Sequence, residues 1–228
     1  SSVIGRRVAD GRLAIVAMEY ALADGPVRID AHPPMRARPM GDLVAALRAL
    51  GVHVTEHGEP GHLPLTVTGP VTGSTVSVPG TISSQYTSGL LLAGGALDDG
   101  LEVAIGSDRL VSAPYVSMTQ HVMQRFGVGT VGHVGSVDRP IAGYATHGGG
   151  YTPADYPIEA DAATAGYFLS AAAITGGTVT VPALPGEDLQ ADAELIDLLE
   201  RMGCERVPGS DGSVTITGPR GGLLRAPE

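Results

Sequence analysis

The chain contains no lysine and no tryptophan, and it is poor in other aromatic residues. All fourteen basic residues are arginine, and only two Phe and seven Tyr occur among 228 residues. Every catalytic role that needs a lysine amine is therefore excluded. With 43% hydrophobic and 17% charged residues the chain is globular, and its core must be built from Ala, Val, Leu and Ile.

A single cysteine, Cys204, excludes an intramolecular disulfide and any cysteine-based zinc site. The formal charge of −10 opposes binding to nucleic acid or to an anionic membrane. The apolar run Leu13–Ala23 superficially resembles a signal peptide, but Glu19 interrupts it, and no stretch reaches the length of a membrane helix. We expect a cytoplasmic protein that binds neither nucleic acid nor membrane.

The most informative feature is an internal repeat. Gly51, Gly127 and Gly203 each end an amphipathic helical segment, and they are spaced 76 residues apart. The three segments are DLVAALRALGV, TQHVMQRFGV and ELIDLLERMGC. Glycine directly after a helix is its usual C-terminal stop, so the spacing predicts three equivalent helices.

A second landmark recurs with the same offset. Val27, Val103 and Val179 each begin a strand-like stretch soon after a glycine-ended helical segment. Those segments are LAIVAMEYALADG, SSQYTSGLLLAGGALDDG and AATAGYFLSAAAITGG, and alternating strands such as LPLTVTG and SVTITG follow. The sequence therefore predicts an α/β (α+β) fold of three helix–strand–helix–strand–strand units of about 76 residues.

A composition shift separates the second and third copies. The stretch Ala145–Pro157 carries three consecutive glycines and two prolines, which indicates a linker or hinge. The triple glycine is not a phosphate-binding P-loop, because no lysine follows it.

Three segments place small polar or basic residues at the start of a predicted helix. They are Arg36–Met40, Ile82–Tyr86 and Val111–Tyr115. Helix N-termini offer unpaired N–H groups and a positive dipole end, so they bind phosphates and carboxylates. An acidic protein that binds anions needs such local donors, because its overall field repels them.

Each of these features also has a purely structural interpretation. Ser83 and Ser112 are suited to be helix N-caps, Arg38 to be a solvated surface residue, and Tyr115 to be a half-buried packing residue. We expect Asp161 to be an N-cap as well.

A pair of histidines, His53 and His57, stands four residues apart in a strand-like stretch. That spacing does not converge on a metal in a strand. We expect no metal site.

Taken together, the segments resemble the EPSP synthase family (3-phosphoshikimate 1-carboxyvinyltransferases) over roughly residues 27–219. The resemblance lies in LPLTVTG, ISSQYTSGLLLAGG and LVSAPYVSMTQHVMQRFGV, with MRARPMGDLVAALRALGV upstream and IEADAATAGYFLSAAAITGGTVTV downstream. It implies two similar domains, each of three helix–strand repeats around a pseudo-threefold axis. Residues 1–150 would form two repeats of one domain, and 151–228 the first repeat of the other.

The resemblance also implies roles for particular residues. Ser83, Ser84 and Gln85 would contact shikimate 3-phosphate, with Ser112 on its phosphate and Tyr115 against its ring. Arg38 would bind phosphoenolpyruvate, and Gln85 would lie near both ligands. The implied reaction adds the shikimate 5-hydroxyl to C2 of protonated phosphoenolpyruvate and then eliminates phosphate. No cofactor is implied, and we expect a monomer.

The chain departs from the family pattern at its ends. The family's phosphoenolpyruvate loop, of the form GNAGTAxR, should fall at residues 7–14, which read RVADGRLA. The family's N-terminal Lys-Ser pair and its later catalytic residues have no counterpart, so we assign no catalytic residue. We expect a fragment of a longer enzyme, the alternative being a degenerate relative.

Two other functions stay open. The UDP-N-acetylglucosamine enolpyruvyl transferases resemble the same fold, but their reactive cysteine lies in a loop, whereas Cys204 follows a helix. The other alternative is a non-catalytic module that keeps an anion site or serves as a scaffold.

Overall fold

A computed structural model describes residues 25–107, 109–134, 141–184 and 190–226. These residues form two compact units, and each is described by itself. The first unit contains the residues up to Val111 together with Val128–Tyr151, and the second contains Ser112–Gly127 and the residues from Thr152 onward.

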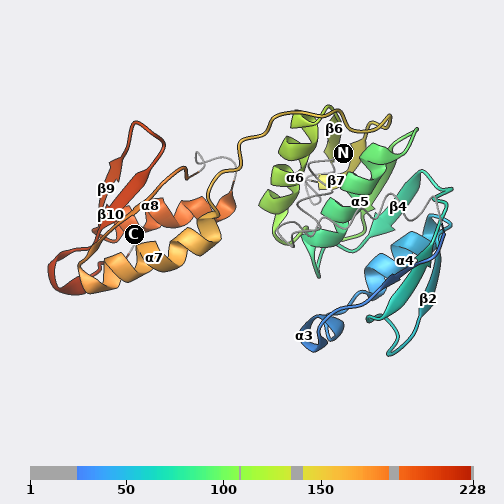
Figure 1. The fold of residues 1–228 in the computed structure, drawn as a ribbon, viewed down its shortest axis with the longest axis horizontal. Coiled ribbons are helices and arrows are strands. Elements are labelled where there is room, and N and C mark those ends of the chain that lie inside the picture. Colours follow the sequence, from blue (N-terminus) through green and yellow to red (C-terminus); the bar gives the residue numbers. More distant parts are fainter. Residues whose placement is uncertain (1–24, 108, 135–140, 185–189, 227–228) are drawn as a thin grey trace. The chain divides into compact units, whose positions relative to one another are not determined.

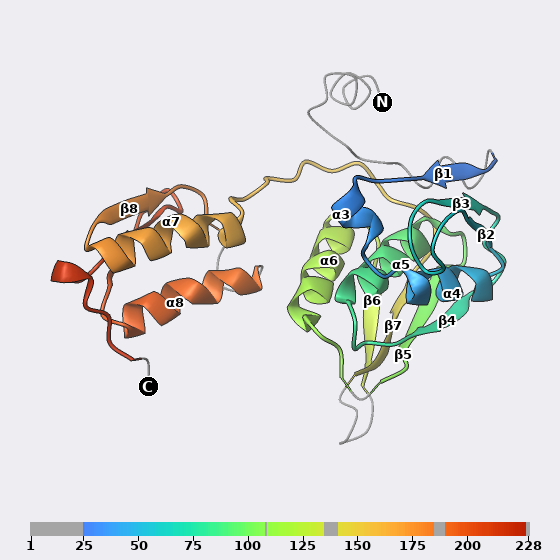
Figure 2. The ribbon, with the colours of Figure 1, turned by 90° about the horizontal axis from the view of Figure 1, so that it is seen from below.

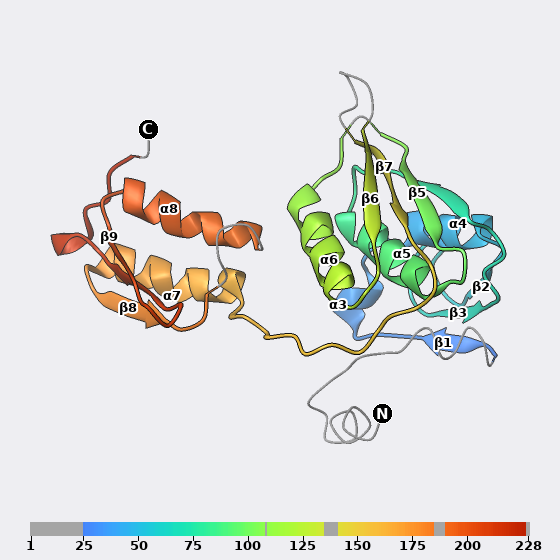
Figure 3. The same cartoon turned by 90° about the horizontal axis from the view of Figure 1, so that it is seen from above.

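In the described residues of the first unit, helices lie beside two β-sheets (Figures 2 and 3). Its elements are β1 (Val27–Ile29), α3 (Pro33–Arg36), α4 (Gly41–Ala49), β2 (His53–Glu56), β3 (Leu65–Thr68), β4 (Thr75–Val78), α5 (Ser84–Ala96), β5 (Leu101–Ile105), β6 (Thr130–Val134) and β7 (Ile141–Thr146). The smaller sheet has the order β1-β3-β2 and is antiparallel throughout. The larger has the order β4-β5-β7-β6, in which only the β4–β5 pair is parallel. Helix α4 packs against β2 and β4, and α5 against β5 and β7.

The second unit contains one three-stranded antiparallel sheet of order β8-β10-β9, with the C-terminal helices beside it (Figure 1). Its elements are α6 (Ala113–Arg125), α7 (Ala162–Thr175), β8 (Thr178–Val181), η1 (Ala191–Ala193), α8 (Glu194–Arg201), β9 (Glu205–Pro208), β10 (Val214–Thr217) and η2 (Arg220–Gly222). Helix α7 packs against β8, β10 and α8, and α8 packs against β9. The core of this unit centres on Leu169, Ile196 and Ile216, which are almost fully buried.

The predicted repeat is confirmed by strand order. In each copy the first strand pairs with the third and the third with the second, giving β1-β3-β2, β5-β7-β6 and β8-β10-β9. The helices α4, α6 and α8 end at Ala49, Arg125 and Arg201, which are again 76 residues apart. Strand burial alternates as a pleated sheet requires, for example along β3 and β10. The three copies thus share the same order of elements and the same strand pairing.

The three glycine stops are confirmed as well. Gly51, Gly127 and Gly203 follow the helix C-caps with φ of 86°, 86° and 100°, a conformation that glycine adopts without steric cost. Each N–H bonds to the carbonyl three residues earlier, at 3.0, 3.1 and 2.9 Å. The chain therefore leaves all three helices by the same turn.

The predicted helix starts and strands are also found, with small shifts. Helices α5, α6 and α7 begin beside Ser83, Ser112 and Asp161. Val27 begins β1, but Val103 and Val179 lie inside β5 and β8, which begin slightly earlier. The helix predicted over Leu13–Gly25, the apolar run within it and the family loop at residues 7–14 lie outside the described residues, except for Gly25.

The stretch Ala145–Pro157, predicted as a linker or hinge, contains the boundary between the two units, which falls after Tyr151, but its triple glycine is firmly held. The N–H groups of Gly149 and Gly150 donate to the carbonyls of Leu97 and Gly95, at 2.9 and 3.0 Å. Gly148 is packed so tightly that an added Cβ would lie 2.2 Å from the carbonyl oxygen of Leu97. Glycine at 148 permits this close approach to the end of α5, while Gly149 and Gly150 have φ of 101° and 86°, which glycine adopts without steric cost. Irregular chain without a helix or strand then continues from residue 152 to 161.

None of the helices in the described ranges combines the length and the apolar character that a membrane crossing requires.

We expect Gly148→Ala to destabilise the first unit by about 1–3 kcal/mol, because the added methyl group would meet rigid backbone. The matched control is Gly89→Ala inside α5, where an added Cβ meets nothing within 4 Å. That change should stabilise by up to about 1 kcal/mol through helix propensity. Urea denaturation of the three proteins measures both effects. Equal stability of Gly148→Ala and the parent would restore the flexible-hinge interpretation.

Candidate functional site

The N-terminus of α5 presents the first group of predicted contacts. Ser83 is its N-cap, and the Ser83 hydroxyl accepts from the backbone N–H of Gln85 at 3.2 Å. Ser84 is buried, whereas Gln85 is exposed. The structural role foreseen for Ser83 is confirmed, and the Gln85 amide is the side chain most available to a ligand at this helix end.

Two neighbouring arginines differ in what they contact. Arg36 makes two hydrogen bonds to the Asp30 carboxylate, both at 2.8 Å, and this lowers the pKa of Asp30. Arg38 is exposed, and in the described part of the chain it forms no ion pair with a carboxylate, its one side-chain hydrogen bond being to the Met35 sulfur at 4.0 Å. Of the two, Arg38 is therefore the one free to bind an incoming anion.

The N-terminus of α6 is built differently. Ser112 occupies the N-cap position with φ 53° and ψ 41°, in the left-handed region, and its side chain makes no capping bond. Such a conformation is uncommon for a residue with a Cβ, and it concentrates at functional positions. Pro114 in the first turn has no N–H to satisfy. The Ser112 side chain is exposed and is not occupied by capping the helix.

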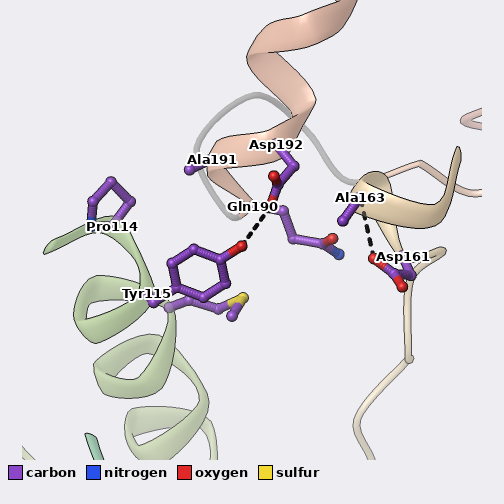
Figure 4. A pocket seen from close by; sticks show the side chains of 8 residues that line it. Pro114, Tyr115, Asp161, Ala163, Gln190, Ala191 and Asp192 are labelled. Atoms are coloured by element: carbon purple, nitrogen blue, oxygen red, sulfur yellow. Dashed lines mark hydrogen bonds between the residues drawn. The ribbon is translucent and has the colours of Figure 1, made fainter. Parts of the chain in front are cut away.

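Tyr115, one turn into α6, lies in a small cavity (Figure 4). Its hydroxyl donates to the Asp192 carboxylate at 2.7 Å, and this bond is the main reason why the pKa of Tyr115 is raised. Asp161 also lines the cavity. With two carboxylates in its wall, this cavity does not suit a phosphate, so any phosphate contact in this region depends on Ser112.

The N-terminus of α7 is closed by its own residues. Asp161 accepts from the N–H groups of Ala163 and Thr164 at 3.0 and 3.3 Å, which confirms it as an N-cap. The Gln190 side chain accepts from Ala162 N–H at 2.8 Å and donates to the Ala160 carbonyl at 3.0 Å. These bonds leave no N–H of the first turn free for an anion. The hydrogen bonds from Thr164 also hold the pKa of Asp161 below its ordinary value.

Cys204 is a core residue. It is buried, and burial raises the pKa of its thiol. It occupies the same place in its copy as Val52 and Val128, which are also buried. The thiol thus serves as a small hydrophobic side chain.

His53 and His57 make separate contacts. They lie close to Thr55 and Thr66 respectively, at 3.3 and 2.7 Å. Within the described ranges, histidine, cysteine and carboxylate side chains do not gather in groups of three that could hold a metal ion.

The predicted contacts are distributed over both units. Arg38, Ser83, Ser84 and Gln85 belong to the first, and Ser112 and Tyr115 to the second. Three residues that make hydrogen bonds beside these contacts or at the start of α7 were not singled out from the sequence. These are Tyr86, Gln190 and Asp192. Each acts through a partner far away in the chain, and no local pattern signals such a partner.

Comparison with known proteins gives the family. Residues 9–223 match the family EPSP synthase (3-phosphoshikimate 1-carboxyvinyltransferase). The chain is 42% identical over 195 residues to the chloroplastic 3-phosphoshikimate 1-carboxyvinyltransferase of Arabidopsis thaliana, covering 84% of this chain and 36% of that protein. It is 38% identical over 199 residues to the 3-phosphoshikimate 1-carboxyvinyltransferase of Halobacterium salinarum, covering 85% of this chain and 44% of that protein.

The fold agrees with this relationship. The structure of EPSP synthase from Acinetobacter baumannii superimposes with a TM-score of 0.61 at 21% identity, over 85% of this chain and 43% of that one. The chain therefore has an enolpyruvyl transferase-like fold, and it belongs to the EPSP synthase family. It spans less than half the length of these relatives.

We expect Asp161→Ala to destabilise the second unit at neutral pH, because two N–H groups of α7 lose their acceptor. Since the folded pKa of Asp161 lies below 3.8, the carboxylate stabilises fully above that pH, and the advantage is lost as the pH falls through the folded value. Thermal unfolding of parent and variant between pH 7 and pH 2 measures this difference. Asp155→Ala, at an exposed position, is the matched control and should show no comparable gap at any pH.

Proposed function

We propose that this chain is the central part of an enzyme that transfers the enolpyruvyl group of phosphoenolpyruvate to shikimate 3-phosphate. Membership of the EPSP synthase family over residues 9–223 carries this proposal. Ser83, Ser84, Gln85, Ser112 and Tyr115 would contact shikimate 3-phosphate, and Arg38 with Gln85 would contact phosphoenolpyruvate.

The condition of the helix N-termini supports the proposed phosphate contact. Asp161 and Gln190 saturate the first turn of α7, whereas Ser112 occupies the N-cap position of α6 and its side chain makes no capping hydrogen bond. A phosphate needs donors that the fold has not already consumed. The N-terminus of α6 meets this condition and that of α7 does not.

The two arginines of the Arg36–Met40 segment support the phosphoenolpyruvate contact in the same way. Arg36 is committed to Asp30, while Arg38 is exposed without a carboxylate partner in the described residues. A carboxylate or phosphate ligand would complete its planar donor set.

A proposal on domain organisation goes with this function. We infer that residues 1–150 are two repeats of one domain and that 151–228 are the first repeat of a second. In support, α7 is apolar around its whole circumference, yet Tyr167, Phe168 and Ile174 are 79%, 60% and 64% exposed. A helix that is hydrophobic all round normally lies inside a core, so this surface suits further repeats of the same kind. A monomeric state and a cytoplasmic location stay predictions.

Replacing Ser112 by Ala should weaken binding of shikimate 3-phosphate roughly ten- to hundredfold, the loss of one hydrogen bond to a charged group. Arg38→Ala should leave this ligand nearly unaffected, because Arg38 is assigned to the other substrate. NMR titration suits the weak affinity expected of a partial site. Ser117→Ala, an exposed serine on the same helix, is the matched control.

Two outcomes of that titration would contradict the proposal. A larger effect of Arg38→Ala than of Ser112→Ala would show that the division of residues between the two substrates is wrong. Absence of saturable binding by the parent chain would favour the scaffold alternative.

The purified chain should show no measurable transferase activity, because it has no lysine and lacks counterparts of the family's acid–base residues. Phosphate release from the two substrates measures this, with protein produced in a host that lacks its own enzyme. The full-length Arabidopsis relative serves as positive control. Turnover by this chain would show that its own residues supply the missing acid and base.

A further inference from the structure

The segment that carries Arg38 is held at several points. Arg36 is bound to Asp30, and the N–H of Met40 donates to the Gly61 carbonyl at 2.6 Å. Between them, the carbonyl of Pro39 accepts a hydrogen bond from the Tyr86 hydroxyl. The last contact joins this segment to the first turn of α5, 47 residues away in the chain.

The Tyr86 side chain is enclosed at this contact. It is only 7% exposed, and burial is the main reason why the pKa of its phenol is raised. The charge of Asp42 raises that pKa further, while the charge of Arg38 lowers it. The hydroxyl therefore remains protonated at neutral pH and can donate.

Both residues of this hydrogen bond are sequence neighbours of proposed ligand contacts. Tyr86 directly follows Gln85, and Pro39 directly follows Arg38. Pro39 also restricts its own φ, which limits how far the Arg38 backbone can swing while Pro39 is held. The hydrogen bond between Tyr86 and Pro39 thus joins the residue after Gln85 to the residue after Arg38.

We propose that Tyr86 is a positioning residue that fixes Arg38 relative to the N-terminus of α5. The inference rests on the proposed function, in which Arg38 binds phosphoenolpyruvate and Gln85 lies near both substrates. The hydrogen bond holds Arg38 and Gln85 in a fixed relative position. The segment that carries Arg38 is therefore already ordered before the ligand binds, and binding costs less conformational entropy. Tyr86 itself touches neither substrate.

A purely structural role for Tyr86 predicts a different effect of Tyr86→Phe on the binding of the two ligands. If the ring only fills the core, then Tyr86→Phe keeps its volume and both ligands bind as before. If the hydrogen bond only stabilises the first unit, Tyr86→Phe weakens the binding of both ligands to the same extent. The proposal requires a selective effect that passes through Arg38.

The first test is an NMR titration of the chain with phosphoenolpyruvate and, separately, with shikimate 3-phosphate. Tyr86→Phe should weaken the binding of phosphoenolpyruvate about two- to tenfold, the effect of one neutral hydrogen bond. It should change the affinity for shikimate 3-phosphate less than twofold. Tyr144→Phe is the matched control, because Tyr144 is equally buried and makes no hydrogen bond within the described residues. It should change neither affinity.

A double-mutant cycle then shows whether the effect passes through Arg38. In the Arg38→Ala background, Tyr86→Phe should have no further effect on phosphoenolpyruvate. Additive effects, or equal weakening of both ligands by Tyr86→Phe, would overturn the inference.

A second measurement needs no ligand and separates this inference from the proposed function. Trypsin can cleave Arg36–Ala37, whereas Pro39 protects the bond after Arg38. Tyr86→Phe should speed cleavage at Arg36–Ala37 several-fold relative to the parent and to Tyr144→Phe. If the parent binds neither ligand, the proposed function fails, and the cleavage rate still decides whether Tyr86 holds this segment. An unchanged rate would overturn the inference.

Discussion

The turn that ends each long helix is the constraint on which the three copies depend. At Gly51, Gly127 and Gly203 the backbone enters the left-handed region, and the chain reverses from helix to strand. The carbonyl of the preceding C-cap residue accepts an N–H from a segment further along, namely from Thr72, Thr152 and Arg225 respectively. At the first two sites a Cβ on the glycine would collide with the threonine side chain. The same turn thus fixes both the end of the helix and the return of the chain, and the sheet order follows from it.

Much of this architecture was accessible from the sequence because it depends on local chemistry. The spacing of the glycines predicted the ends of α4, α6 and α8, and Ser83 and Asp161 marked helix starts by their capping side chains. The hinge prediction failed at Gly148, since glycine signals flexibility and close packing equally well in a sequence. Only the tertiary contact with the end of α5 distinguishes them. Within the site, Arg36 and Arg38 look alike in the sequence, and the partner Asp30 is what separates them.

An acidic chain that binds anions must create attraction locally. Here the net charge is −10, and carboxylates such as Asp161 and Asp192 lie close to the predicted contacts. Donors of the fold engage these carboxylates, because Asp161 accepts from N–H groups of α7 and Asp192 accepts from the hydroxyl of Tyr115. Arg36 is likewise committed to Asp30. The groups left exposed, Arg38, Gln85 and Ser112, are a cation and neutral donors, which is the set an oxyanion requires.

The burial of Cys204 allows opening of the second unit to be followed by thiol labelling. It is the one thiol in the sequence, and it lies in the core between α8 and β9. A thiol reagent can reach it only when that unit opens, since its raised pKa and its enclosure both suppress reaction in the folded state. The rate of labelling therefore reports the opening equilibrium of the unit that contains Cys204. Substitution by valine, the residue in both equivalent places, would give a thiol-free chain with its core intact.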